Sequence, residues 1–517
     1  MAMLLKKLQW AYLNIFKTRL LLFLFLLVYF ATTFFSYKDF GLTMDEFFVY
    51  TRGEYFYHKV VGNDKYLQKG FVIKEYGNEN LLYYNSTYSA LLYALNDSQS
   101  YENYHLYNMI FASLSFVVMY EFVLFCFKKD KIALLGPVFL FLTPRFLGHI
   151  PANPKDIPFA TVFMVALFLI YIHRKLPNNL KILLLGAAIG LATSLRLIGL
   201  SLIFVYFFYA LYIQGIDMFK NSLKKSGEFI FEMILVSLLS FMVLMASIPY
   251  IGADPVNHTL ELLQVNKIFP WYGTILFFGS VFNESTIPLS YLPIWLLIST
   301  PIFILILSIM SFMHKRDQKQ RLLHMLILIS IGIQILMYVL LKPVIYNGVR
   351  HYLFLLPQLV ILSVIGLQLI LKKYPKFKLI IVSAVLINTS LILFFYVKNY
   401  PYLYPYFNDG VQMVPGLEQQ FDQEYWAASD KEALIWLKDT LTEKSDAPKI
   451  YMCSKSMSLN YYFPDAIDMN HDISQADYII CYNQPELKEI KKSIDGDVIF
   501  SVERMGRVYN TIYKPTR

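Results

Sequence analysis

Charged residues are scarce in this chain of 517 residues. Lys, Arg, Asp and Glu make up 16% of the sequence and hydrophobic residues 56%, whereas a soluble domain typically has about 25% charged and 45–50% apolar residues. This composition excludes an ordinary soluble enzyme. It predicts a polytopic α-helical membrane protein, because only such a protein buries so many apolar side chains in lipid.

Cysteines are also rare. Cys126, Cys453 and Cys481 fit no metal-ligand spacing. In the topology predicted below, only Cys453 and Cys481 share a compartment, so a disulfide and two buried thiols are both open, and we expect the thiols.

A glycine-rich loop of the nucleotide-binding kind is absent from the sequence, which disfavours ATP and nucleotide-sugar donors. The net charge of +9 comes from short basic clusters between apolar runs, as in cytoplasmic loops. A nucleic-acid partner is therefore not predicted. Residues 20–37 have no following cleavage-site pattern and are predicted to be a retained anchor.

Eleven apolar runs are long enough to be predicted as membrane-spanning helices. They begin near Leu20, Asn108, Ile132, Ile157, Leu180, Leu197, Glu228, Leu292, Leu322, His351 and Leu379. The basic clusters fall on alternate loops, which places the N-terminus in the cytoplasm. Segments 38–107, 251–291 and 398–517 then face outward, and we expect the protein in the bacterial inner (plasma) membrane.

Residues 180–213 could form one apolar helix, but it would overshoot the bilayer by roughly 20 Å. Both ends carry basic residues, so the chain is predicted to turn back at 193–196 and to leave Arg196 at the outer face.

The chain is predicted to divide into a membrane domain, 1–397, and an extracytoplasmic α/β domain, 398–517. In the second, 430–441 has helical spacing, while 449–453, 478–481 and 498–513 read as strands, the last interrupted by a turn at 505–507. Residues 421–426 are aromatic and acidic, and predict either sugar binding or docking against the membrane domain.

Two adjacent carboxylates, Asp45 and Glu46, follow the first apolar run. An acid at a membrane exit suits a general base, and a solvated loop start is the alternative.

Cationic residues stand in other predicted outer loops, namely Arg145, His149, Lys155, Arg350 and His351. Together with Arg196, they would form an anion site. Asp156 precedes Pro158 and an apolar run, so it is predicted to be a helix N-cap. Trp271 and Tyr272 open a Gly- and aromatic-rich loop expected near the site, although packing alone explains much of it.

These ingredients favour a sugar donor carried on a polyprenyl phosphate. A carboxylate would deprotonate an acceptor hydroxyl, which attacks the anomeric carbon with inversion, while cations stabilise the departing lipid phosphate. The acceptor is a lipid, glycan or protein. A secondary transporter and a non-catalytic envelope assembly protein are the alternatives, and a transporter would place its charges at the bilayer midplane.

The sequence also resembles a known family. The motifs are Asp45-Glu46, the stretch from Pro144 to Pro158, Trp271-Tyr-Gly-Thr with Pro288 and Tyr291-Leu-Pro293, and Arg350-His351-Tyr352. Over about residues 1–400 they resemble bacterial members of the protein O-mannosyltransferase-like group. That group includes the lipid A aminoarabinose transferases and has the C-type glycosyltransferase fold.

The resemblance implies that Asp45 is the base and that Glu46 assists in acceptor binding or orientation. It also implies that Lys155 and the arginines face the donor phosphate, while His149, Trp271 and Tyr272 are predicted to contact substrate. Eukaryotic members carry a large insert that has no counterpart here, which disfavours protein mannosylation. No cofactor is predicted, and a divalent cation shared by Asp45, Glu46 and His149 stays open.

Overall fold

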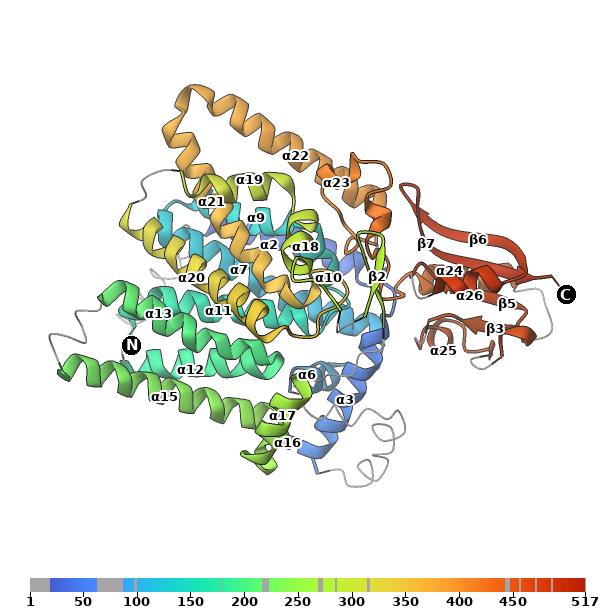
Figure 1. Ribbon diagram of the computed structural model, residues 1–517, viewed down its shortest axis with the longest axis horizontal. Coiled ribbons are helices and arrows are strands. Elements are labelled where there is room, and N and C mark those ends of the chain that lie inside the picture. The colour runs from blue at the N-terminus through green and yellow to red at the C-terminus, as the bar shows by residue number, and fades with distance from the viewer. Residues whose placement is uncertain are drawn as a thin grey trace, which may run out of the picture.

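The computed structural model describes residues 19–62, 87–96, 100–176, 178–215, 223–267, 273–283, 286–313, 317–441, 447–454, 457–469, 472–484 and 487–516. Figure 1 shows a bundle of helices that run roughly along its long axis, with a small sheet domain at one end. We call the described residues up to 399 the helical bundle and those from 400 to 516 the C-terminal part.

The elements of the helical bundle follow in chain order. They are α2 (Leu20–Ser36), α3 (Met44–Val60), α6 (Thr87–Leu95), α7 (Tyr101–Phe127), α8 (Asp130–Ala133), α9 (Leu135–Phe141), α10 (Pro144–His149), α11 (Asp156–Ile172), η2 (His173–Lys175), α12 (Asn178–Leu195), η3 (Leu197–Leu200), α13 (Ser201–Gln214), α15 (Leu223–Ser247), α16 (Pro249–Ala253), α17 (Asn257–Lys267), β1 (Ile275–Phe277), β2 (Ser280–Phe282), α18 (Tyr291–Ser299), α19 (Ile302–Met310), α20 (Gln318–Leu341), η4 (Arg350–Leu355), α21 (Leu356–Lys373), η5 (Pro375–Phe377) and α22 (Lys378–Asn399).

Each predicted apolar run contains helix, because in lipid the backbone must satisfy its own hydrogen bonds. Within the described residues, six helices are long and apolar enough to cross a membrane, or seven if the bent pair α18 and α19 is one span. The pair bends by 108° at Thr300-Pro301, where proline interrupts helical hydrogen bonding. These long apolar helices make the chain an integral membrane protein. The remaining predicted runs form shorter helices, so the count of eleven crossings stays a prediction.

The chain breaks its helix where the sequence predicted a turn. Helix α12 ends at Leu195, and Arg196 has an extended backbone before η3 begins at Leu197. Arg196 lies at the end of the bundle that carries the C-terminal part, as its contacts described below establish.

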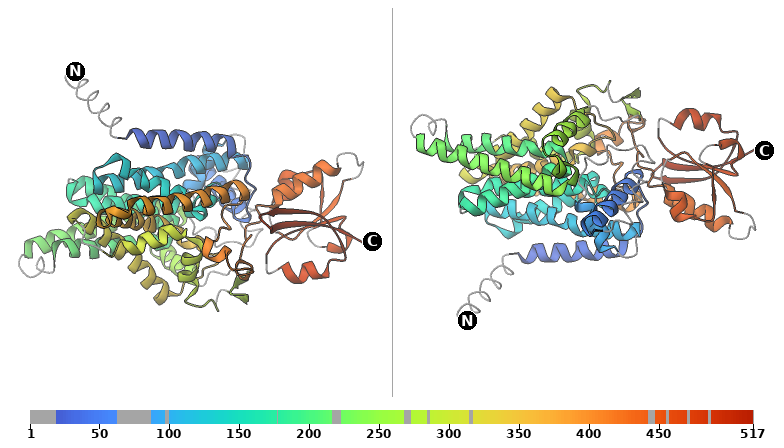
Figure 2. Two further views of the ribbon diagram at one scale, coloured as in Figure 1. Left: turned by 90° about the horizontal axis from the view of Figure 1, so that it is seen from above. Right: turned by 90° about the horizontal axis from the view of Figure 1, so that it is seen from below.

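The C-terminal part holds α23 (Asp409–Gln412), η6 (Glu418–Gln420), α24 (Asp430–Leu441), β3 (Lys449–Met452), α25 (Ser458–Tyr462), β4 (Ile467–Asp468), η7 (Ile473–Gln475), β5 (Tyr478–Tyr482), α26 (Lys488–Ser493), β6 (Gly496–Arg504) and β7 (Arg507–Pro515). Its mixed sheet has the order β4-β3-β5-β7-β6, with β3 parallel to both its neighbours and β7 antiparallel to both of its own. Helices cover both faces (Figure 2). The predicted helix and strands of this domain are present, and β4, α25 and α26 are additions.

The β6–β7 hairpin turns through Met505 and Gly506, both of which have positive φ angles of 51° and 75°. A two-residue turn with both φ angles positive matches the twist of paired strands. The core of this domain includes Leu434 and Leu437 from α24 together with Ile480 and Ile512 from the sheet.

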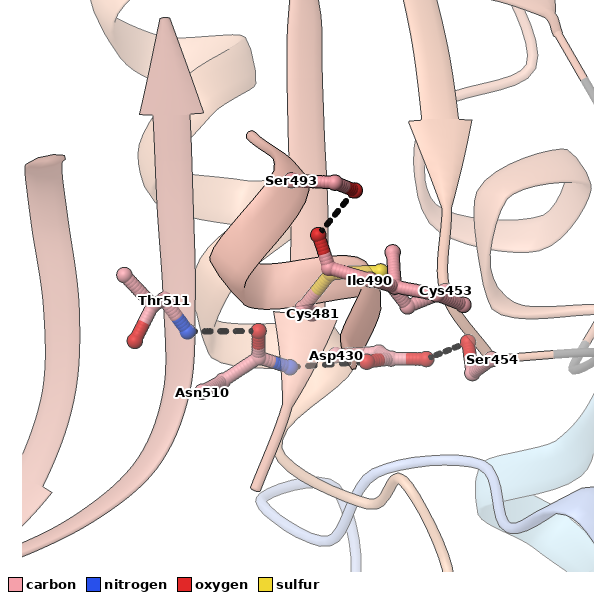
Figure 3. Close-up of a disulfide and its surroundings, with 8 residues drawn as sticks. All are labelled: Asp430, Cys453, Ser454, Cys481, Ile490, Ser493, Asn510 and Thr511. Carbon is pink, nitrogen blue, oxygen red and sulfur yellow. Dashed lines mark hydrogen bonds between the residues drawn. A yellow bond between two sulfur atoms is a disulfide. The ribbon is translucent and has the colours of Figure 1, made fainter. Parts of the chain in front are cut away.

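Cys453 and Cys481 form a disulfide, so the expectation of two thiols was wrong (Figure 3). Cys453 follows strand β3 and Cys481 lies in the neighbouring strand β5, which brings their Cα atoms to 4.8 Å. The hydropathy pattern predicted both strands but not that they are neighbours, and this neighbourhood makes the bond geometrically accessible.

The disulfide closes a loop with a sequence separation of 28 residues. Chain-entropy reasoning for a loop of that size gives about 3–4 kcal/mol of stabilisation. We therefore expect reductant to lower the melting temperature of the C-terminal part in the full-length protein. Limited proteolysis at increasing temperatures measures this melting. A Cys453→Ala/Cys481→Ala variant should melt at the lower temperature with or without reductant. A wild-type melting curve that ignores reductant would contradict this expectation.

Candidate active site

Glu46 is fully buried, and its carboxylate holds the start of helix α3. One oxygen accepts hydrogen bonds from the backbone N–H of Thr43 (2.8 Å) and from its hydroxyl (3.0 Å), which makes Thr43-x-x-Glu46 a capping box. The other oxygen lies 2.8 Å from Nε2 of His105, which is also fully buried. Glu46 therefore fixes the position of the helix start.

Asp45 is the accessible acid of the pair. Its side chain is 48% exposed, and one carboxylate oxygen lies 2.7 Å from a terminal nitrogen of Arg350. The Arg350 side chain is only 6% exposed. A half-exposed carboxylate thus meets a buried guanidinium.

Arg350 also faces a second carboxylate. Its Nε lies 3.7 Å from Asp156, and Asp156 is in turn paired with the guanidinium of Arg196. We call the four linked side chains Asp45, Arg350, Asp156 and Arg196 the ion-pair ladder. They come from four separate chain segments, which meet at the bundle end next to the C-terminal part.

The prediction that Asp156 is an N-cap was wrong. Lys155 occupies the cap position of α11, and Asp156 is the first helical residue. The capping interaction comes instead from Asn153, whose side-chain oxygen accepts from the backbone N–H of Asp156 at 2.8 Å, while its amide donates to the Asp156 carboxylate at 3.0 Å. This leaves Asp156 available to the arginines.

Two further cations adjoin the ladder. Lys155 interacts electrostatically with Arg52, Arg196 and Arg350, and with Asp156 as its opposite charge. Burial, and then these neighbouring cations, hold the pKa of Lys155 well below its usual range. The four ladder side chains sum to zero charge, and Lys155 and Arg52 are two further basic residues beside them.

Arg52 was not found by sequence reasoning. It lies two helical turns after Asp45 on α3, so the two residues share a helix face. With Lys155 and Ser89, it lines a small cavity of a size for a single water molecule. The spacing between Asp45 and Arg52 was the available signal.

His351 adjoins the ladder, whereas Arg145 does not. His351 interacts electrostatically with Arg196 and Arg350, and its ring packs edge-on against Tyr346. Arg145 is fully buried, donates from Nε to the Tyr406 carbonyl at 3.0 Å, and has its guanidinium carbon 4.7 Å from the Trp295 ring centre. Arg145 thus packs between aromatic rings beside the site.

His149 is also fully buried. Its Nε2 lies 2.9 Å from the Tyr425 hydroxyl, and its Nδ1 lies 3.0 Å from the side-chain amide of Asn153. Burial lowers the pKa of His149 well below its usual value, which favours the neutral ring. Through Asn153, His149 is connected to Asp156, and its predicted contact with substrate stays a prediction.

The segment 421–426, for which sugar binding and docking were both open, packs against the bundle. Trp426 is buried, its ring centre lies 5.2 Å from the guanidinium carbon of Arg350, and it lies 4.5 Å from the ring centre of His149. Trp426 and Tyr425 therefore form one wall of the site, which sequence spacing could not reveal.

The predicted contacts Trp271 and Tyr272 lie outside the described residues. Among the residues that are described, no group of three or more His, Cys, Asp or Glu side chains is arranged to hold a metal ion. Asp45, Glu46 and His149, which could have shared a cation, face Arg350, His105 and Tyr425, respectively.

No protein family model matches the chain, and no curated protein matches its sequence. Similarity is found among solved structures. One is the crystal structure of ArnT from Cupriavidus metallidurans bound to undecaprenyl phosphate, at 11% identity and a TM-score of 0.51, covering 95% of this chain and 97% of that one.

Two further structures are similar at lower TM-scores. They are ArnT from Cupriavidus metallidurans in the apo state (0.45, 10% identity, 84% and 87% coverage) and the mycobacterial arabinofuranosyltransferase AftD (0.35, 12% identity, 84% and 36% coverage). Over nearly its whole length, therefore, this chain has the fold of ArnT, a lipid A aminoarabinose transferase with the C-type glycosyltransferase fold.

Proposed function

We propose that the protein is a membrane glycosyltransferase that moves a sugar from a polyprenyl-phosphate donor to an acceptor hydroxyl with inversion. The observation that carries this proposal is the accessible carboxylate of Asp45, 2.7 Å from Arg350 in a cluster that also holds Arg196, Lys155 and Arg52. The fold supports the same reading, since ArnT was solved with undecaprenyl phosphate bound.

The proposed reaction is one displacement. Asp45 takes the proton of the acceptor hydroxyl, the hydroxyl oxygen bonds to the anomeric carbon, and the bond from that carbon to the phosphate oxygen breaks. The phosphate leaves with the electron pair, so its charge changes from one negative to two. The basic side chains Lys155, Arg52, Arg350 and Arg196, gathered in one place, suit that product.

The remaining residues have positioning roles in this proposal. Glu46 holds the first turn of α3 and thereby orients Asp45. His351 lies beside Arg196 and Arg350 and helps to line the phosphate site. Arg145 packs against the rings of Trp295 and Phe407 and holds the neighbouring side of the site in place. His149, Trp271 and Tyr272 are proposed to act on the substrate side.

The topology belongs to the proposal as well. Eleven crossings with a cytoplasmic N-terminus would put the ladder and residues 398–517 on the extracytoplasmic face of a bacterial inner membrane, with 1–397 as the membrane domain. The acceptor would then be a lipid, glycan or protein of the cell envelope.

Replacing Asp45 by Asn should abolish transfer while strengthening phosphate binding. Loss of a general base costs about 10²- to 10⁴-fold in rate, and the neutral amide no longer competes with phosphate for Arg350. Transfer from a polyprenyl-phosphate sugar and binding of undecaprenyl phosphate are measured in nanodiscs.

Glu54→Gln is the matched control for Asp45→Asn. Glu54 is a carboxylate on the same helix, and it contacts Tyr93 rather than the ladder. It should leave both quantities near the wild-type values. Full transfer by the Asp45→Asn variant would rule out the proposed base.

Lys155→Met should weaken binding of undecaprenyl phosphate by about 10- to 100-fold, the value of a hydrogen bond to a charged group. The pKa of Lys155 is lowered without ligand, and a bound phosphate would raise it, so binding takes up a proton. Wild-type affinity should consequently fall as the pH rises through the ligand-free pKa of Lys155. The variant should lack this fall, and an unchanged pH profile would contradict the assignment.

A further inference from the structure

The C-terminal part holds the segment that leads into Asp45. The backbone N–H of Met44 donates to the carbonyl of Trp426 at 3.1 Å, and the backbone N–H of Leu42 donates to the hydroxyl oxygen of Tyr462 at 3.0 Å. The ammonium of Lys431 lies 3.3 Å from the carbonyl of Phe40. Three residues of the C-terminal part thus bind the backbone of 40–44.

The same segment is packed without spare room. A Cβ atom added to Gly41 would lie 1.9 Å from the carbonyl oxygen of Ala428, so this close approach of two backbones requires glycine. On the other side, Met44 packs against Ala427, Tyr482 and Leu487.

The disulfide adjoins this contact. Cys453 packs in the same apolar cluster as Met44 and Tyr482, and its partner Cys481 directly precedes Tyr482 in β5. Figure 3 shows Cys453 and Cys481 beside Asp430, which accepts from Ser454 and Asn510. The disulfide therefore cross-links the two chain segments, at Cys453 and just before Tyr482, that border the packing site of Met44.

Trp426 contacts Arg350 and the residue that precedes Asp45. Its carbonyl accepts from the residue that precedes Asp45, and its ring lies under the guanidinium of Arg350. A shift of Trp426 would therefore move the carboxylate and the cation relative to each other.

We propose that the C-terminal part positions the catalytic acid: Tyr462, Trp426 and the close approach at Gly41 hold residues 40–44 so that Asp45 faces Arg350. Tyr462 and Trp426 are positioning residues, since neither is required to touch substrate. This inference rests on the proposed function for its effect on catalysis, but the restraint on the backbone is testable without it.

The test uses the full-length Tyr462→Phe variant, which loses one hydroxyl and leaves the Leu42 amide without its acceptor. Hydrogen exchange should speed up at the amides of residues 42–46. The kcat for transfer should fall by about 10- to 100-fold, the cost of a misplaced catalytic group, with affinity for undecaprenyl phosphate unchanged. The matched control is Tyr513→Phe, because Tyr513 packs within the sheet domain.

Gly41→Ala is a second variant, which changes the segment 40–44 itself and leaves the C-terminal part unchanged. Its methyl group cannot fit against Ala428, so it should produce the same faster exchange and the same loss of kcat while Tyr462 is intact. Agreement of the two variants separates a positioning effect from loss of one hydroxyl.

The possible results separate the two proposals. Unchanged exchange at 42–46 in both variants overturns the positioning role, whatever the transfer activity. Faster exchange with unchanged kcat also overturns it and leaves the transferase proposal standing. If wild-type protein transfers no sugar from a polyprenyl-phosphate donor, the transferase proposal fails, and the exchange data still decide whether the backbone is held.

Discussion

The buried guanidinium of Arg350 is the constraint around which the bundle end next to the C-terminal part is built. A lone charge with so little exposure would cost several kcal/mol. Asp45 and Asp156 on either side offset that cost, and the faces of Trp426 and Tyr346 add cation–π contact. Four chain segments must therefore meet at one point before the charge is compensated.

Two sets of charged residues lie at this end of the bundle. The ladder is neutral, and each of its members has an opposite partner within reach. Lys155 and Arg52 lie beside it as two further basic residues. The two arginines of the ladder are held in place by their carboxylates before any ligand arrives, and such preorganisation is what makes charge stabilisation in a reaction effective.

Much of the fold was legible in the sequence because the solvent enforces it. Lipid leaves an apolar segment no choice but a helix, and alternation with turn residues predicted the strands β3, β5, β6 and β7. The break at Arg196 followed from the length of the apolar run and from the basic residues at both of its ends. The disulfide could not be predicted, since it depends on β3 and β5 being neighbours.

The site was only partly legible. Asp45, Lys155, Arg196 and Arg350 were found because charges between apolar runs stand out. The prediction that Asp156 caps its helix was wrong, because the side chain of Asn153 makes the capping hydrogen bond instead. Arg52 was missed because its role depends on which face of α3 meets the ladder. Trp426 was missed because it comes from a distant segment of the chain, and local sequence does not predict that contact.

Helices α21 and α22 are comparable in length and hydropathy, yet neighbouring side chains cover 83% of the apolar window that includes α21 and only 11% of the one that includes α22. The rest of the described protein therefore covers little of α22, which Figure 1 shows along one edge of the bundle. Its apolar residues can be exchanged for one another with little effect on the fold, whereas the same exchanges in α21 would open cavities. The length and apolar character of α22 can therefore change with the thickness of the membrane, with little constraint from packing inside the protein.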